Sequence, residues 1–141
     1  MTCVIRQVAF TSPDFARCFE IRLAVFVEEQ NVPIEEEHDE HDETALHFLA
    51  TLDDKPAGTA RVLLKHSTAK ITRVAVLRAA RGHGIGAALM RHIESTVPAR
   101  RFTLDAQLHA LPFYEHLGYV AESEVFMEAG IPHRHMAKNL P

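Results

Sequence analysis

The stretch of sequence that decides the fold is RVAVLRAARGHGIGAALM, residues 73–90. An apolar strand pattern ends at Leu77, a basic turn with three glycines follows, and a helix of small and apolar residues begins at Gly84. Glycine lets the backbone approach a ligand closely because it has no Cβ. The start of a helix offers unpaired N–H groups and the positive end of its dipole to an anion. With Arg78 and Arg81 adding positive charge, the stretch predicts a pyrophosphate site.

Two other interpretations of the glycines compete with this one. Gly82, Gly84 and Ala87 satisfy the relaxed dinucleotide pattern G-x-G-x-x-A, and Asp105 lies where a ribose-binding acid is expected. However, only 36 residues follow Asp105 in this chain of 141, too few for the remaining units of a doubly wound fold. The turn is also long and rich in arginine, whereas a dinucleotide turn is tight. A plain structural turn is the second alternative.

The rest of the chain reads as strands and helices around one sheet. Alternating and β-branched residues predict strands over residues 4–10, 45–52, 57–64, 70–77, 101–105, 119–127 and 133–138. Helical spacing predicts helices over residues 12–27, 84–97 and 108–117. We find no repeat or linker, so we expect an α/β (α+β) fold in a single domain spanning residues 1–141.

A long segment between the first helix and the second strand, residues 28–43, lacks an apolar period and is predicted to be a loop. Its acidic run, residues 35–43, contains two histidines and several carboxylates. The spacing of these ligands matches no zinc or calcium site. We therefore expect a solvent-exposed acidic loop and no metal.

The glycine-rich stretch also carries a family resemblance. R-x-x-G-x-G, preceded by a V-x-V strand, resembles the acetyl-CoA motif of the GNAT N-acetyltransferase superfamily, with Arg81, Gly84 and Gly86 at the motif positions. The resemblance implies that backbone N–H groups of the loop bind pyrophosphate, and that the strand pairs with the pantetheine arm and directs an N–H at the thioester carbonyl. The residues assigned to acetyl-CoA in this stretch are Val74, Ala75, Val76, Arg81, Gly82, His83, Gly84, Ile85, Gly86 and Ala87.

A second block, residues 107–119, resembles the N-x-x-A-x-x-x-Y-x-x-x-G-F/Y pattern of the same superfamily. Gln107 stands where asparagine is usual. The block adds four residues to the expected acetyl-CoA site: Gln107, Ala110, Phe113 and Tyr114. The resemblance implies that Tyr114 lies near the sulfur and protonates the leaving thiolate, and a tyrosine of ordinary pKa holds its proton at pH 7. The alternative is a buried aromatic residue on an amphipathic helix.

Further matches point to the ElaA/YjcF-like bacterial branch of the superfamily. They are RLAVFVEEQ at residues 22–30, the residues Asp39, Asp42 and His47, and EAGIPH at residues 128–133. The resemblance implies the acyl-CoA N-acyltransferase (GNAT) fold, with a single mixed, mostly antiparallel sheet flanked by helices. It also implies that a homodimer can form through the late strands.

The implied activity is transfer of an acetyl group from acetyl-CoA to a primary amine, by direct attack in a ternary complex. The amine must first lose a proton. Glu28 and Glu29, where the first helix meets the long loop, are the candidate bases, with His133 a weaker one. For His47, within a strand, a structural role is favoured. Neither cysteine has a motif that suggests a covalent carrier, and the rival function is a non-catalytic acyl-CoA-binding module.

Charge and composition limit the classes of molecule that the protein is expected to bind. A net charge of −4 and a pI near 6.2 argue against a nucleic-acid partner. No signal pattern or apolar run of membrane-spanning length is seen, so we expect a cytoplasmic protein with no membrane partner. The expected acceptor is a small-molecule or peptide amine, which the acidic run could attract electrostatically.

Overall fold

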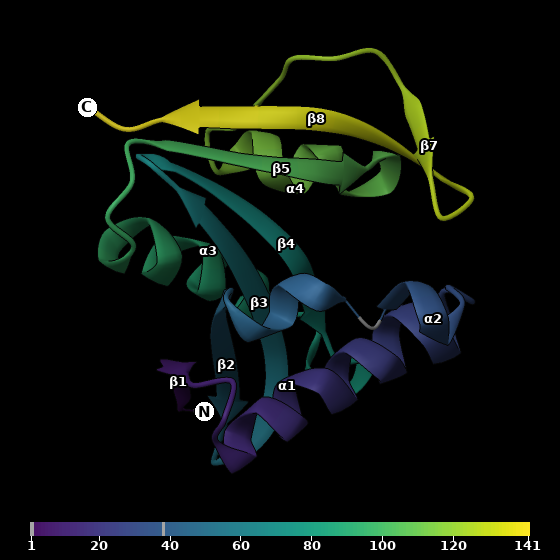
Figure 1. Ribbon diagram of the computed structural model, residues 1–141, viewed down its shortest axis with the longest axis vertical. Helices are drawn as coiled ribbons and strands as arrows, with labels where there is room; N and C mark the ends of the chain where they lie inside the picture. Colours follow the sequence, from purple (N-terminus) through teal and green to yellow (C-terminus); the bar gives the residue numbers. More distant parts are fainter. Residues whose placement is uncertain (1, 38) are drawn as a thin grey trace.

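The computed structural model describes residues 2–37 and 39–141 (Figure 1). One eight-stranded sheet runs through the molecule in the order β1-β2-β3-β4-β5-β8-β6, with β7 paired to β8. The strands are β1 Cys3–Val8, β2 Leu46–Leu52, β3 Lys55–Lys65, β4 Thr68–Val76, β5 Arg101–Gln107, β6 Val120–Ala121, β7 Phe126–Glu128 and β8 Ile131–Asn139. Among the described pairs only β4 and β5 are parallel, so the predicted mixed, mostly antiparallel sheet is confirmed.

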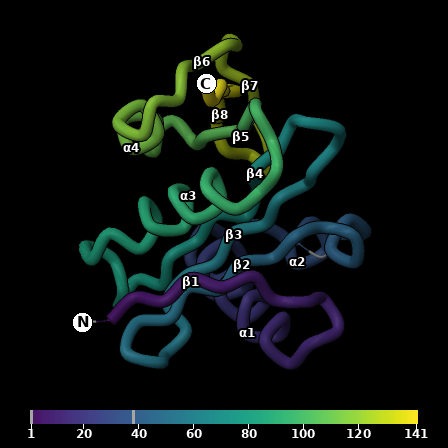
Figure 2. The backbone as a smooth tube through the Cα atoms, turned by 90° about the vertical axis from the view of Figure 1, so that its left-hand side faces the viewer, coloured from purple at the N-terminus to yellow at the C-terminus, as the bar shows by residue number. Residues whose placement is uncertain are grey.

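Helices cover the sheet from both faces (Figures 1 and 2). The helical segments are α1 Pro13–Arg22, the π-helical turn η1 Leu23–Glu29, α2 Ile34–Glu37, η2 Glu40–Glu43, η3 Arg78–Ala80, α3 Ile85–Thr96, η4 Leu108–Ala110 and α4 Leu111–His116. Successive residues of β2 show why two faces are covered. Phe48 packs in the cluster that contains α3, whereas Leu49 packs in the cluster that contains α1. Side chains of a strand alternate between faces, so one apolar strand supports both layers.

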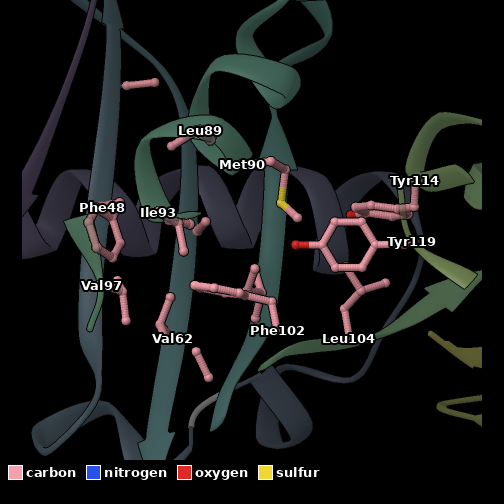
Figure 3. Close-up of a cluster of buried hydrophobic side chains, with 14 of the residues drawn as sticks. Phe48, Val62, Leu89, Met90, Ile93, Val97, Phe102, Leu104, Tyr114 and Tyr119 are labelled. Atoms are coloured by element: carbon pink, nitrogen blue, oxygen red, sulfur yellow. The ribbon is translucent and has the colours of Figure 1, made fainter. Parts of the chain in front are cut away.

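The larger core lies between α3 and the sheet. Leu89, Met90 and Ile93 of α3 are fully buried and meet Phe48 and Phe102 of the sheet (Figure 3). These positions recur at helical spacing, which places them on one face of α3. The close fit of α3 depends on Gly58 of β3, because a Cβ there would lie 2.9 Å from Ile85 Cγ2. The core therefore fixes the start of α3 against the central strands.

The two central strands part after a short contact. β4 and β5 pair only from Thr68↔Arg101 to Lys70↔Thr103, after which they diverge (Figure 1). In the diverging part β4 has a bulge, where Arg73 and Val74 oppose the single residue Ala60 of β3. Arg73 has φ +54°, and bulges of this kind redirect the strand and its side chains. The divergence and the bulge together open the sheet beside β4.

The segment of residues 28–43 differs from its prediction as a solvent-exposed loop. η1 continues the first helix to Glu29, and α2 and η2 follow. Glu37 and Asp42 are buried, with 2% and 3% of their surface exposed. Three arginines pair with these carboxylates, and that pairing is what permits their burial. His38 of the predicted acidic run lies outside the described residues.

The last predicted strand before β8 is also shorter in the structure. Residues 119–127 were expected to form one strand, but they contain the two short strands β6 and β7. Both pair with β8, at Val120↔Ala137 and at Phe126↔His133. Between them the chain bends at Ser123, whose carbonyl accepts a hydrogen bond from Arg134 and whose hydroxyl accepts one from the His135 amide. The β7–β8 hairpin consequently stands over the end of β5.

Candidate active site

The glycine-rich loop forms a cradle of free backbone amides at the start of α3. Ala88 donates the first helical hydrogen bond, to the Gly84 carbonyl at 3.0 Å. Within the described part of the chain, the amides of residues 82–87 donate to no backbone carbonyl. Gly82 and Gly84 have φ of +85° and +74°, and a Cβ at either would meet nothing within 4 Å. Free N–H groups at a helix start and open space above them suit an anion such as pyrophosphate.

The Arg81 side chain anchors this loop. It donates to both carboxylate oxygens of Glu29, at 2.8 and 2.7 Å, and to the Val76 carbonyl at 3.1 Å. Arg78 lies 3.5 Å from the same carboxylate. The hydrogen bonds and charge of Arg81 hold the pKa of Glu29 below its ordinary value. The loop, the end of β4 and the end of η1 are thus joined through one guanidinium group.

A cavity of about 300 Å³ lies above the loop. It brings together Val74, Val76, Arg81, Gly82, Gly84, Ile85, Gly86, Ala87 and Phe113, all of them residues assigned to acetyl-CoA from the sequence. Phe113 packs directly on Gly86, where a Cβ would be 3.1 Å from the ring. Two of the residues assigned from the glycine-rich stretch do not line this cavity: Ala75 is buried in the core beneath α1, and His83 is exposed on the loop.

A second, larger cavity of about 570 Å³ opens where β4 and β5 part. Its floor comes from the diverging strands, residues 71–74 and 104–107, and its walls come from η1, α2, η2, η4 and the β7–β8 hairpin. Val74 lines both cavities, so they adjoin at the bulge of β4. The arrangement offers one molecule a path from the loop to the bulge and a second molecule a separate chamber.

Tyr114 lies in the wall of the larger cavity. The residue is 8% exposed, and its ring packs edge-on against Phe113. Its ring also packs edge-on against Tyr119 (Figure 3). Burial raises the pKa of Tyr114 to about 12, so the hydroxyl holds its proton at neutral pH. No residue in the described parts of the chain forms a hydrogen bond with this hydroxyl, which leaves the proton available to a bound molecule.

Gln107 and Ala110 also line the larger cavity. The Gln107 side-chain amide donates to Gln30 at 2.9 Å, and its oxygen lies 2.6 Å from His109 Nε2. These contacts connect β5 to the turn after η1, across the opening between the strands. In this structure the polar groups of Gln107 are therefore engaged by protein partners.

The four candidate bases lie in different places. Glu28 is exposed and Glu29 binds Arg81, and neither is among the described residues that line the larger cavity. His47 is buried against Phe10 and Phe15 and donates through Nε2 to the Asp42 carbonyl at 2.7 Å. Burial lowers the pKa of His47, which fits the predicted structural role. Only His133 of the four lines the larger cavity.

A buried ion network, which the sequence did not predict, supports the cavity wall. Arg22 and Arg61 both bind Asp42, at 3.0 and 2.9 Å, while Arg73 on the bulge binds Glu37 at 3.2 Å. Burial alone would raise the pKa of Asp42, but hydrogen bonds and charge from the two arginines outweigh it and lower that pKa. The sequence did offer one signal for this network: Arg22 lies at helical spacing from Cys18 on the buried face of α1. A buried arginine needs a carboxylate partner.

Two findings concern the described residues as a whole. They contain no group of three or more His, Cys, Asp or Glu side chains arranged to hold a metal ion. They also include no helix long and apolar enough to cross a membrane.

Comparison with known proteins places this geometry in a family. Residues 12–140 match the model of the acetyltransferase (GNAT) domain. The Bacillus subtilis N-acetyltransferase YjcF is 40% identical over 125 residues, which cover 86% of this chain and 89% of that protein. The crystal structure of Escherichia coli ElaA is 31% identical with a TM-score of 0.84, covering 98% of this chain and all of that one.

A more distant structure shares the fold. A GNAT family acetyltransferase from Elizabethkingia anophelis, solved with acetyl-CoA bound, is 14% identical with a TM-score of 0.73, and 98% of each chain is covered. The sheet that parts beside β4, the amide cradle before α3 and the matched sequence lead to one conclusion: the chain belongs to the GNAT family of acetyltransferases.

Proposed function

We propose that this acetyltransferase moves an acetyl group from acetyl-CoA to a primary amine by direct attack within a ternary complex. The observation that carries the proposal is the hydroxyl of Tyr114, which has no hydrogen-bond partner among the described residues and belongs to a residue in the wall of a cavity that adjoins the amide cradle at Val74. Binding of acetyl-CoA by a protein of the same fold supports the assignment of the cradle to this molecule.

In this proposal the pyrophosphate binds the free amides of residues 82–87. The pantetheine arm runs along β4 from Val76 to Val74, where the backbone lacks a partner strand on the β5 side. Ala75 and His83 contribute through their backbone, because their side chains do not line the smaller cavity. Gln107 and Ala110 border the thioester end.

Tyr114 acts as the general acid. Its raised pKa keeps the hydroxyl protonated, and the leaving thiolate takes that proton as the C–S bond breaks. A tyrosine hydroxyl with a raised pKa gives up its proton only to a strong base. A thiolate released in the cavity is such a base. The proton on the newly acylated nitrogen then restores the tyrosine.

A direct attack is favoured over a covalent acetyl-enzyme. Cys18 is fully buried in the core beneath α1, and Cys3 is exposed on β1. Neither thiol lines the cavities, so neither is placed to accept the acetyl group. Burial also raises the pKa of Cys18, which makes it a poor nucleophile.

The proposal changes the role expected of Glu28 and Glu29. Both lie outside the larger cavity, and the lowered pKa of Glu29 makes it a weak proton acceptor. Glu29 is assigned instead to the positioning of Arg81 and the loop. Glu28 is exposed on the last turn of η1, and the proposal assigns it no proton transfer.

Isothermal titration calorimetry with acetyl-CoA, and with NADH as control, tests the first half of the proposal. We expect micromolar binding of acetyl-CoA and no heat with NADH. The second half is tested by thiol release from acetyl-CoA with a panel of amines: putrescine, glucosamine, an aminoglycoside and a lysine-containing peptide. Thiol release that depends on none of the amines, together with tight acetyl-CoA binding, would point to a binding module instead.

A further inference from the structure

We propose that His133 is the general base that takes the proton from the acceptor ammonium group, with Glu128 stabilising the imidazolium that forms. This inference rests on the proposed function and names the missing proton acceptor of that reaction. His133 lies near the start of β8 and is 7% exposed, and Glu128 ends β7 in the same hairpin. Both side chains line the larger cavity together with Tyr114.

The tautomer of His133 is set by its neighbour in the chain. Nδ1 lies 2.6 Å from the Ile131 carbonyl, and a carbonyl can only accept, so Nδ1 carries the hydrogen. In the neutral ring Nε2 then has a free lone pair. The ring plane is fixed by stacking on Phe126, at 5.9 Å between centroids and 20° between planes. The basic nitrogen of His133 is therefore oriented before any substrate binds.

Nε2 faces a carboxylate across a short gap. It lies 3.8 Å from Glu128 Oε2, a separation at which an imidazolium would gain electrostatic stabilisation. The Glu128 side chain is 59% exposed, so solvent screens the interaction and its effect is small. As in other histidine bases, a hydrogen-bond acceptor holds one ring nitrogen and the other ring nitrogen receives the proton.

Other titratable groups on the cavity are less suited to this task. The carboxylates of Glu37 and Asp39 are held by arginines, and Asp105 is held by His135 at 2.8 Å and Lys70 at 3.4 Å. His41 and His109 are exposed, and His109 Nε2 is engaged by Gln107. A base works best when its ordinary pKa lies near the operating pH, which favours an imidazole over a free carboxylate such as Glu36.

The proposed step balances as follows. His133 Nε2 takes one proton from the ammonium group, and the neutral nitrogen forms a C–N bond with the acetyl carbon. The C–S bond breaks, and the thiolate takes the Tyr114 proton. The second proton on the nitrogen returns to Tyr114, leaving one proton on His133 for release to solvent. The products are the N-acetylated amine and free thiol.

The test compares H133Q with the wild-type protein, using whichever amine of the panel gives the highest rate. General base catalysis predicts a loss of about 10²- to 10³-fold in kcat/KM, with the Kd for acetyl-CoA unchanged. The pH profile of kcat/KM should also differ in shape from that of the wild type. The described charged and titratable groups that line the same cavity, and can also shape this profile, are Glu36, Glu37, Asp39, His41, Arg61, Lys70, Arg73, Asp105, His109, Tyr114 and Glu128.

Controls separate the base role from a structural one. H116Q alters an exposed histidine at the end of α4, outside both cavities, and should keep wild-type rates. E128Q should lower kcat/KM by only about threefold, as suits an exposed charge. Far-UV circular dichroism and the acetyl-CoA titration show whether H133Q is folded.

A readout that needs no acceptor is the nitrogen NMR spectrum of the histidine rings in the intact protein. The proposal expects His133 to carry its hydrogen on Nδ1 in the neutral form. An Nε2–H tautomer, or an H133Q variant with wild-type kcat/KM and pH profile, overturns the inference while leaving the acetyltransferase proposal intact. If the wild-type protein acetylates no amine although the Nδ1–H tautomer is found, the proposed function fails and the inference about His133 fails with it.

Discussion

Glu29 and Arg81 form a two-point ion pair, with distances of 2.7 and 2.8 Å, between the end of η1 and the glycine-rich loop before α3. The residues are 52 positions apart in the chain. Arg81 also holds the Val76 carbonyl at the end of β4. One side chain thus joins the loop and the end of β4, which line the smaller cavity, to η1, which lines the larger one.

We predict that R81M weakens acetyl-CoA binding about 10-fold, because the loop loses both of its anchors. E29Q should weaken binding only about threefold, since the glutamine can still accept one hydrogen bond and the pair is partly exposed. The two residues act through one contact, so the E29Q/R81M double variant should bind about as weakly as R81M alone. Calorimetric titration at low and high salt measures all three, and strictly additive losses would contradict a shared anchor.

The buried network predicts a second effect, on stability. D42N removes the buried carboxylate that Arg22 and Arg61 share, and leaves Glu37 and Asp39 as their remaining charged partners. Removing one partner of a buried ion pair costs about 3–5 kcal/mol in the free energy of unfolding. Urea unfolding followed by circular dichroism measures the loss. E43Q, a change at the neighbouring exposed residue, is the matched control and should fall within about 0.5 kcal/mol of the wild type.

Acid should remove the same contribution from the wild-type protein. The pKa of Asp42 is lowered in the folded state, so its stabilising effect is fully present above the ordinary aspartate pKa and is lost as pH falls through the folded value. Asp39 and Glu29, whose pKa values are also lowered, act in the same direction. Below pH 4 the free energy of unfolding should therefore fall more steeply in the wild type than in D42N. Equal slopes would show that Asp42 does not govern acid unfolding.

The sequence predicted those parts of the site that depend on local geometry. Gly82 and Gly84 have the left-handed backbone that glycine makes easy, and the helix start that follows them is local as well. The apolar pattern of the strands predicted the sheet, because successive side chains of a strand such as β2 point to opposite faces and pack in two separate cores. In each of these cases the residues that determine the structure are close together in the chain.

The acidic run shows what the sequence could not provide. Glu37 and Asp42 resemble solvent-exposed residues until Arg61 and Arg73, from strands later in the chain, are placed beside them. The bulge that turns Arg73 towards Glu37 depends on the pairing of β3 with β4. His133 was similarly difficult to evaluate, because the neighbours that make it a base are the Ile131 carbonyl and the stacked Phe126 ring. These contacts form only after the hairpin has folded.

The contact between Gly86 and Phe113 leads to a further prediction. A methyl group at Gly86 would lie 3.1 Å from Phe113 Cζ, so the ring, which lines the smaller cavity, must shift by a few tenths of an ångström. We expect G86A to weaken acetyl-CoA binding about 10-fold with little effect on folding, since Gly86 lies in the first turn of α3 at an ordinary helical backbone angle. F113L removes the atom that clashes, so G86A/F113L should bind more tightly than G86A. Titration of the three variants decides this, and no recovery in the double variant would show that the ring is not the cause.

The role of Tyr114 gives the last prediction. Y114F removes a hydroxyl that forms no hydrogen bond with the described residues, so the folded protein loses no internal contact. We expect an unchanged midpoint of thermal unfolding and an unchanged Kd for acetyl-CoA. Loss of the general acid should lower kcat by about 10²-fold with the best acceptor of the panel, measured by thiol release.

The matched control for Y114F is Y119F, which removes the other tyrosine hydroxyl. That hydroxyl donates to Glu94 at 2.7 Å and lies outside both cavities. Y119F should lower stability while retaining kcat, because its hydroxyl supports the core rather than the reaction. Should Y114F retain full kcat with bound acetyl-CoA, the leaving thiolate must be protonated by solvent, and the tyrosine would be a packing residue of the cavity wall.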